Sequence, residues 1–260
     1  MFLKNFKAKT PSLRFKKNIY KLSPFFKKNN KLTITFNNKS GRNNSGSIVV
    51  RHRGGYIFNN KNIINYNRIQ LTNLSIITSI SYFDKNSCFL GLIKYSTGSI
   101  SYIKLANGNF IGDYIKSYDK PINFSFNTKN LLGCFIILKL APKYCVFSNI
   151  IQNNISKYAK SAGTYLNIVK KIKELNIFIL KLPTGEKKYF SGLTTAIIGR
   201  NSNHLNKFTC IGKAGINRLK GFRPTVRGVA MNPVDHPHGG RTKTNQPEMS
   251  PWGWIAKKTK

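Results

Sequence analysis

The stretch Cys88-Phe89-Leu90-Gly91-Leu92-Ile93-Lys94-Tyr95, followed by the turn Ser96-Thr97-Gly98 and by residues 100–105, decides the fold class. Two dense apolar runs joined by a Gly-containing turn are typical of a β-hairpin. Residues 32–36 and 76–82 alternate between apolar and polar side chains, as half-buried strands do, and residues 84–86 indicate a further turn. Short strands at this spacing predict a small barrel over residues 31–120. A partly open five-stranded barrel of the OB type is a common nucleic-acid-binding module.

A second β-rich unit is expected over residues 121–198. We expect strands at residues 131–140, 163–169, 176–182 and 187–190, with Pro183-Thr184-Gly185 as a hairpin turn. Residues 141–158 show weak helical spacing, but a long loop fits them equally well.

Both ends of the chain are basic and irregular. Residues 1–30 show neither a helical nor a strand period, and they fit either a cleavable organelle presequence or a retained tail that binds RNA. From residue 199 to residue 260, Gly, Pro, Arg, Lys and His dominate, with a short helical turn expected at residues 214–219. Such a segment is expected to become ordered only against a partner.

The charge of the chain points to a polyanionic partner. Lys and Arg total 44 and Asp and Glu total 7, which gives a net charge of +37, and no acidic residue precedes Asp84. A chain with this charge repels itself unless an anion neutralises it. The balance excludes an ordinary soluble metabolic enzyme acting alone and favours nucleic acid.

The cysteines and the apolar runs exclude other classes of protein. The four cysteines, at positions 88, 134, 145 and 210, lack zinc-knuckle spacing and are expected to be reduced. The longest apolar run, residues 131–138, is far shorter than the roughly 18 residues that span a membrane. The abundance of Asn, Ile, Lys, Tyr and Phe fits A- and T-rich codons.

Three stretches combine glycine with arginine: residues 40–46, 51–55 and 221–228. Glycine lets the main chain approach phosphates closely, and arginine binds phosphate in a bidentate manner or stacks on bases. The stretches therefore predict contacts with an RNA backbone, although solvated turns between strands would look similar. Between the first two, Ile48-Val49-Val50 is expected to resume an extended strand.

The run Met231-Asn232-Pro233-Val234-Asp235-His236-Pro237-His238-Gly239-Gly240 is the most singular in the chain. Asp235, His236 and His238 could hold a metal or support acid–base chemistry, but no further ligand is apparent nearby. An RNA-embedded loop is the favoured interpretation, and a structural turn is the other alternative. The segment Ala159-Lys160-Ser161-Ala162-Gly163-Thr164-Tyr165 likewise suits phosphate contact, or an ordinary turn.

These runs, together with Leu182-Pro183-Thr184-Gly185-Glu186, Gly212-Lys213-Ala214-Gly215 and Pro251-Trp252-Gly253, resemble the universal L2 family of large-subunit ribosomal proteins. They stand in the family's order from about Thr10 to Gly253, while residues 59–158 match by pattern more than by letter. The resemblance implies an OB-like barrel, then an SH3-like barrel over residues 121–198, then a C-terminal extension into rRNA. The fold class expected is therefore mainly β.

The resemblance also implies a role. Family members organise large-subunit rRNA, help the subunits to join and support the peptidyl-transferase region, and His236 corresponds to the family's histidine nearest the catalytic RNA. Catalysis is not carried over, because peptide transfer is the work of RNA. The chain departs from the family at Tyr56-Ile57-Phe58 and at Arg241, where the family usually has Gly-His-Lys and Gly, and its basic tail after Trp252 is short.

The motifs and the resemblance together give a set of expected rRNA contacts. The expected residues are Arg42, Asn43, Asn44, Arg51, His52, Arg53, Lys160, Ser161, Thr164, Lys213, Arg218, Arg223, Arg227, Asn232, His236, His238 and Arg241. The expected partners are large-subunit rRNA, neighbouring ribosomal proteins and the small subunit across the intersubunit face. We expect no enzyme activity, no small-molecule substrate and no cofactor or protein-held metal, apart from Mg²⁺ ions that bridge to rRNA.

The sequence leaves two alternative functions open and also predicts a cellular compartment. The rivals are a free OB-fold RNA chaperone, and a metal-dependent hydrolase built on Asp235, His236 and His238. The family's start is visible at Thr10-Pro11, so about nine residues stand upstream, fewer than the 15 or so of a typical presequence. We therefore expect a retained basic tail. The composition favours an organellar protein, mitochondrial rather than plastid.

Overall fold

The computed structural model describes residues 3–19, 30–35, 39–55, 60–66, 68, 74–82, 87–118, 131–142, 144–242 and 247–256. The chain forms two compact units, and each is described by itself. Unit 1 comprises Met1–Phe36 and Asn60–Gly212, and unit 2 comprises Asn37–Asn59 and Lys213–Lys260. The chain is mainly β, as the sequence predicts, and its sheets agree with an OB-like and an SH3-like barrel.

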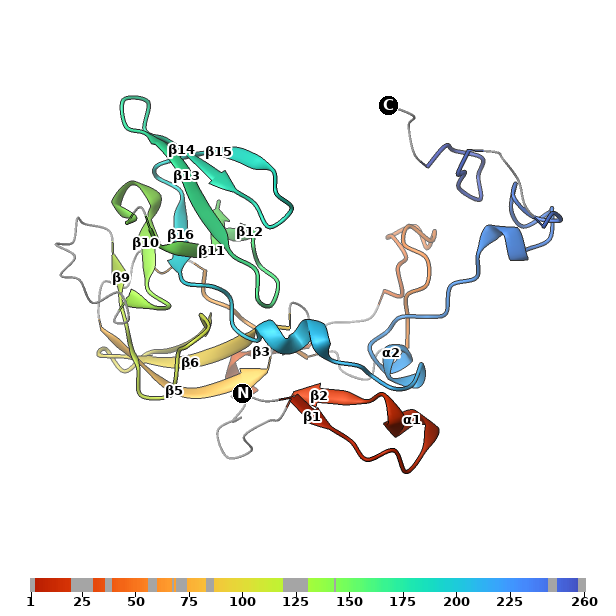
Figure 1. Ribbon diagram of the computed structural model, residues 1–260, viewed down its shortest axis with the longest axis horizontal. Coiled ribbons are helices and arrows are strands. Elements are labelled where there is room, and N and C mark those ends of the chain that lie inside the picture. Colours follow the sequence, from red (N-terminus) through yellow and green to blue (C-terminus); the bar gives the residue numbers. More distant parts are fainter. Residues whose placement is uncertain are drawn as a thin grey trace. The chain divides into compact units, whose positions relative to one another are not determined.

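All the named strands belong to unit 1 (Figure 1). In chain order they are β1 (Leu3–Asn5), β2 (Lys17–Ile19), β3 (Thr33–Thr35), β4 (Asn60–Asn62), β5 (Ser75–Tyr82), β6 (Phe89–Tyr95), β7 (Ile100–Lys104), β8 (Tyr114–Ile115), β9 (Ser117–Tyr118), β10 (Phe135–Ile137), β11 (Val146–Gln152), β12 (Ile155–Tyr158), β13 (Leu166–Ile172), β14 (Ile177–Lys181), β15 (Lys187–Ser191) and β16 (Thr195–Ile198).

The helices are short. In unit 1 they are α1 (Pro11–Arg14) and the 3-10 turns η2 (Asn30–Leu32), η4 (Leu138–Leu140) and η5 (His204–Phe208), and in unit 2 they are α2 (Gly215–Leu219) and η6 (Gly228–Ala230). The short helix expected at residues 214–219 is therefore confirmed. Within the part of the chain that the structure describes, no helix is long and apolar enough to cross a lipid bilayer.

The first sheet is antiparallel, with strand order β7-β6-β5-β8. β5, β6 and β7 agree with the predicted strands to within about a residue, whereas the short strand β8 was not predicted. Ile77, Ile93 and Ile103 project into its core with at most 1% of their surface exposed. The separate pair β3-β4 leads to Ile64, which bridges in parallel to Tyr102 on β7.

The second sheet has the order β15-β14-β13-β11-β16-β10-β9, and β12 pairs with β11. β14 lies between β13 and β15 and runs antiparallel to both (Figure 1). Ile136, Phe147 and Leu180 are fully buried in the hydrophobic core that this sheet encloses. The predicted turn at residues 183–185 is confirmed, since the Gly185 N–H donates to the Leu182 carbonyl at 2.9 Å and Gly185 has a φ of 96°.

Residues 141–158 are neither a helix nor a long loop. They form most of β11 and β12, joined by Asn153 and Asn154, whose φ values of 52° and 60° are those of a tight hairpin turn. Five consecutive residues of β11 are buried, so the strand lacks the alternation that would have revealed it. The predicted strand at residues 131–140 is shorter than expected, because only Phe135–Ile137 is extended before η4 begins.

Two further expectations are corrected. Ile48-Val49-Val50 does not form a strand, because the N–H groups of Val49 and Val50 both donate to the Gly41 carbonyl and curl the segment. The N-terminal residues contain the hairpin β1-β2 although their sequence has no strand period. Lys17 on β2 exchanges two 3.0 Å backbone hydrogen bonds with Cys210, which gives the hairpin a partner.

Some expectations fall outside the described residues. These are the turn at residues 84–86, the departure at Tyr56-Ile57-Phe58, residues 20–29 of the basic tail and residues 119–130 at the start of the second barrel.

Candidate nucleic-acid interface

The glycine–arginine stretches of unit 2 form one layer although about 170 residues separate them in the sequence. The Arg223 N–H donates to the His52 carbonyl at 3.0 Å, and the Gly54 N–H donates to the Gly221 carbonyl at 3.1 Å. The Arg53 guanidinium lies over the Phe222 ring, 4.5 Å from its centroid, which holds the arginine in place. Two stretches that the sequence treats separately are thus one structural element.

This layer surrounds a hollow, here called the arginine hollow. Its lining residues are Ser40, Arg42, Ile48, Val50, Arg51, His52, Arg53, Gly54, Gly55, Arg218 and Arg223. Five arginines line this one concavity, and its lining includes no carboxylate. Because like charges repel, such an arrangement favours an anion, and guanidinium groups match phosphate oxygens in geometry. Hence the hollow has the chemistry of a phosphate-binding surface.

The neighbouring asparagines partly serve the loop itself. The Asn43 side-chain oxygen accepts hydrogen bonds from the Ser45 hydroxyl at 2.8 Å and from the Ser47 N–H at 2.9 Å, which closes the turn at residues 43–47. The Asn44 oxygen accepts from the Lys39 ammonium at 3.1 Å. Asn43 therefore has a structural role that the sequence did not reveal.

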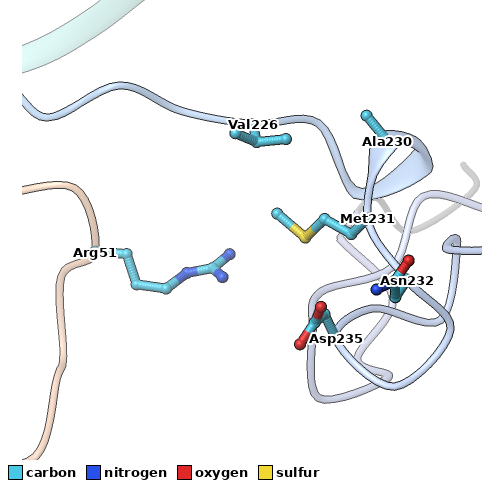
Figure 2. Close-up of a pocket in the computed structure, with 6 residues that line it drawn as sticks. All are labelled: Arg51, Val226, Ala230, Met231, Asn232 and Asp235. Atoms are coloured by element: carbon cyan, nitrogen blue, oxygen red, sulfur yellow. The ribbon is translucent and has the colours of Figure 1, made fainter.

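A second concavity of unit 2 lies against the run at residues 231–240. Figure 2 shows the Arg51 guanidinium pointing across it toward Met231 and Asp235, with Asn232 and Val226 nearby. Arg51 also lies 5.5 Å from the Trp252 ring centroid. Arg51 therefore lines both concavities.

The two histidines of this run differ in their surroundings. His236 is only 8% exposed, and a Cβ on Gly228 would lie 2.6 Å from its ring, so the ring packs tightly on that glycine. The His236 Nδ1 accepts a 3.0 Å hydrogen bond from the His238 N–H. His238 Nε2 lies 3.1 Å from the Pro247 carbonyl and 3.3 Å from the Met249 N. His236 thus organises the loop from within.

In unit 1, the segment at residues 159–165 leads into β13. Ala159 is buried with a φ of 46°, whereas Lys160 and Ser161 are exposed. Thr164 is half-buried, and its hydroxyl donates to the Ser161 carbonyl at 2.7 Å. The Arg200 Nε donates to the Gly163 carbonyl at 2.6 Å. The segment is therefore a braced turn that presents a lysine and a serine to solvent.

The structure places the other expected contacts at the surface of unit 2: Lys213, Arg227 and Arg241 are exposed. The sequence did not indicate that Arg200 contacts the turn at residues 159–165 or that Trp252 lies beside Arg51. It also gave no sign of Lys104, Asn149 and Asn201, whose buried side chains form the hydrogen-bond network behind residues 159–161.

The chemistry of these surfaces is that of binding. Among the described residues, no three His, Cys, Asp or Glu side chains come together as metal ligands. The Nδ1 atom of His236 accepts from the His238 N–H, and the Nε2 atom of His238 lies within hydrogen-bond distance of the Met249 N, so one nitrogen of each ring is engaged by the backbone.

The sequence matches two protein-family models. The model described as the RNA binding N-terminal domain of Ribosomal Proteins L2 matches residues 29–117, and the model of the C-terminal domain of the same proteins matches residues 132–253. The first match covers β3 to β8 and the second covers β10 to β16 and most of the C-terminal segment.

Individual relatives cover most of the chain. The large ribosomal subunit protein uL2m of Reclinomonas americana is 37% identical over 99% of this chain and 92% of its own length. The uL2 protein of Mycoplasma pneumoniae is 37% identical over 85% of this chain and 78% of its own. The uL2m protein of Paramecium tetraurelia is 34% identical over 81% and 84%. With both domain models matched in order and relatives aligned over nearly its full length, the chain belongs to the ribosomal protein L2 family.

Proposed function

We propose that this chain is a structural constituent of the large ribosomal subunit that binds and organises large-subunit rRNA. The observation that carries the proposal is the arginine hollow, which five arginines and no carboxylate line in a chain of net charge +37. The names of the relatives support a ribosomal role and do not favour a free RNA chaperone.

The mechanism is electrostatic and geometric. Lys and Arg side chains release counterions from RNA phosphates when they bind, so affinity falls steeply with salt. The two barrels of unit 1 dock as preformed bodies, and contacts with RNA offset the entropy cost of ordering unit 2.

The family resemblance gives the finer parts of the proposal. The run at residues 231–240 lies near the peptidyl-transferase centre, and the protein supports subunit association through contacts with neighbouring proteins and the small subunit. His236 holds the loop in shape and takes no part in chemistry. The chain acts on no small-molecule substrate and is not an enzyme.

We propose a mitochondrial ribosome as the location, with a plastid ribosome as the alternative. Two relatives carry the uL2m name of mitochondrial forms, and the composition fits A- and T-rich codons. Bacterial relatives match at similar identity. The support for a mitochondrial location therefore comes from the uL2m names and the composition taken together.

No resident cofactor is proposed. A Mg²⁺ ion at this surface would take Asp235 as one ligand and RNA phosphates as others, because the described residues offer no complete ligand set.

Sedimentation tests the function. Mitochondrial lysate is fractionated on a sucrose gradient and each fraction is examined by mass spectrometry. We expect the protein in the large-subunit fractions, in stoichiometric amount and resistant to moderate salt. Recovery in plastid large-subunit fractions would move the location and keep the function. Recovery near the top of every gradient would contradict a ribosomal role and restore the chaperone.

A further inference from the structure

A lysine is buried between the two barrels of unit 1. Lys104, at the end of β7, has 1% of its surface exposed. Its ammonium group donates to the Asn149 side-chain oxygen at 2.9 Å and to the Lys160 carbonyl at 3.1 Å. Its stem starts in the first sheet and its head group reaches the second, so Lys104 joins the two.

Two buried asparagines complete the network. Asn149 and Asn201 are fully buried, and the Asn149 amide donates to the Asn201 side-chain oxygen at 2.5 Å. The Asn201 amide donates to the Ala159 carbonyl at 2.6 Å and to the Ser161 carbonyl at 3.0 Å. These bonds fix Asn201 with its amide toward the 159–161 turn.

The network therefore captures three successive carbonyl groups. Asn201 binds the carbonyls of Ala159 and Ser161, and Lys104 binds the carbonyl of Lys160 between them. While these carbonyls face inward, the side chains of Lys160 and Ser161 are exposed. These are the two residues of the turn expected to contact phosphate.

The choice of lysine at this buried position needs a reason. Its hydrogen-bond partners are an amide oxygen and a carbonyl oxygen rather than carboxylates, and its ammonium group also lies 5.7 Å from the Tyr66 ring centroid. These contacts and the nearby Cys88 offset its desolvation only in part. Burial lowers the pKa of Lys104 to about 8. An apolar side chain of similar length would avoid this cost. It could not make the hydrogen bonds of the ammonium group, so these bonds are what a lysine contributes at this position.

We propose that Lys104 is a positioning residue for RNA binding: it holds the Lys160 carbonyl inward so that the Lys160 side chain meets a phosphate. The inference rests on the proposed function, because it takes Lys160 as an RNA contact. Lys104 is buried and cannot touch RNA itself, so its effect on RNA binding is indirect. Coupling to Lys160 distinguishes an effect through the turn from one through the two sheets that Lys104 also joins.

The test is a double-mutant cycle with the full-length chain and a transcript of the source organism's large-subunit rRNA. Affinity is measured against salt concentration for the wild type, Lys104→Met, Lys160→Met and the double variant. Lys160→Met should lower the salt slope by about one, the value for one lost phosphate contact. Lys104→Met should lower it by a similar amount, and the double variant should resemble either single one.

A matched control separates positioning from general damage. Lys94, exposed on β6, also carries one positive charge, and Lys94→Met should leave the effect of Lys160→Met unchanged. If Lys104→Met does not fold, as judged by its melting transition, Lys104→Gln replaces it, since its shorter side chain keeps an amide donor but loses the charge and the reach.

The outcomes are distinct. A folded Lys104 variant with an unchanged salt slope, or with an effect that adds fully to that of Lys160→Met, would overturn the inference. A wild-type chain that does not bind the transcript at all would overturn the proposed function instead.

Discussion

Unit 1 and unit 2 differ in the interactions that stabilise each of them internally. Every buried apolar cluster among the described residues lies in unit 1, where isoleucine, leucine and phenylalanine side chains close both barrels. Unit 2 relies on backbone hydrogen bonds between loops and on arginines laid over the rings of Phe222 and Trp252. Unit 1 can therefore fold by its own burial, whereas unit 2 has its charges arranged for a partner that supplies the missing stabilisation.

The largest expected difference comes from removing one aromatic ring from each unit. Phe147 is fully buried in the second barrel, and Phe147→Ala should reduce the free energy of unfolding by about 3–5 kcal/mol. Trp252 is 68% exposed, and Trp252→Ala should leave that free energy nearly unchanged while weakening rRNA binding. Urea unfolding and rRNA affinity, measured on both variants, check the pair.

Phe208, which is 51% exposed in unit 1, serves as the control for Trp252. Phe208→Ala should change neither quantity greatly. If Trp252→Ala lowers the free energy of unfolding as much as Phe147→Ala does, unit 2 has a core of its own and the contrast between the units is wrong.

Two glycines repeat the comparison on a smaller scale. A Cβ on Gly91 in β6 would lie 2.5 Å from the Leu105 side chain, so Gly91→Ala should cost about 1–3 kcal/mol of stability through overpacking. A Cβ on Gly228 would lie 2.6 Å from the His236 ring, so Gly228→Ala should displace that ring and weaken rRNA binding with little loss of stability.

Gly98 offers the control for both, since an added Cβ meets nothing within 4 Å there, although its φ of 84° makes alanine strained. Thermal unfolding and rRNA affinity are measured for the three variants. A Gly228→Ala chain that binds rRNA as the wild type does would show that the packing of His236 does not shape the binding loop.

The sequence predicts unit 1 far better than unit 2. Alternating side chains place β5, and the dense apolar run at residues 88–95 places β6, because local pattern and final packing agree. The pattern fails at β11, where five consecutive residues are buried and the polar Ser148 and Asn149 interrupt the apolar side chains, so that no period of two is visible in the sequence.

The binding surfaces show the same limit. The glycine–arginine motifs contain four of the five arginines of the hollow, and Arg218 lies outside them in α2. Nothing local indicates that residues 51–55 pair with residues 221–223. The importance of Lys104 is likewise invisible, because its burial depends on Asn149 and on the Lys160 turn, more than 40 residues away. Contacts between distant loops and buried polar groups arise from tertiary packing rather than from propensity.

The pH dependence of stability sharpens the account of unit 1. Burial lowers the pKa of Lys104 from 10.5 to about 8, so the folded chain loses this proton before the unfolded chain does. The cost of burying the charge is present below pH 8 and is relieved as the pH rises. Between pH 7 and pH 9, the wild type should gain about 1 kcal/mol of stability that Lys104→Met lacks.

Urea unfolding of the two chains at pH 7, 8 and 9 checks this difference. The range stops at pH 9 because burial raises the pKa of Cys88 from 9.0 to about 11, and that group lowers stability as the pH increases further. Parallel curves for the wild type and Lys104→Met would mean that the ammonium group is solvated and the buried network is incorrect.

The smallest expected effect distinguishes charge from geometry in the arginine hollow. Arg53 lies 4.5 Å from the Phe222 ring, and Arg53→Lys keeps the positive charge but loses the planar, bidentate group. The salt slope of rRNA binding should therefore stay the same, while affinity falls about fivefold, or roughly 1 kcal/mol. Arg227→Lys, at an exposed position outside the lining of the hollow, should lose less. If the two variants lose equal affinity, rRNA binding by unit 2 depends only on its positive charge. The aromatic rings that fix its arginines would then contribute nothing to recognition.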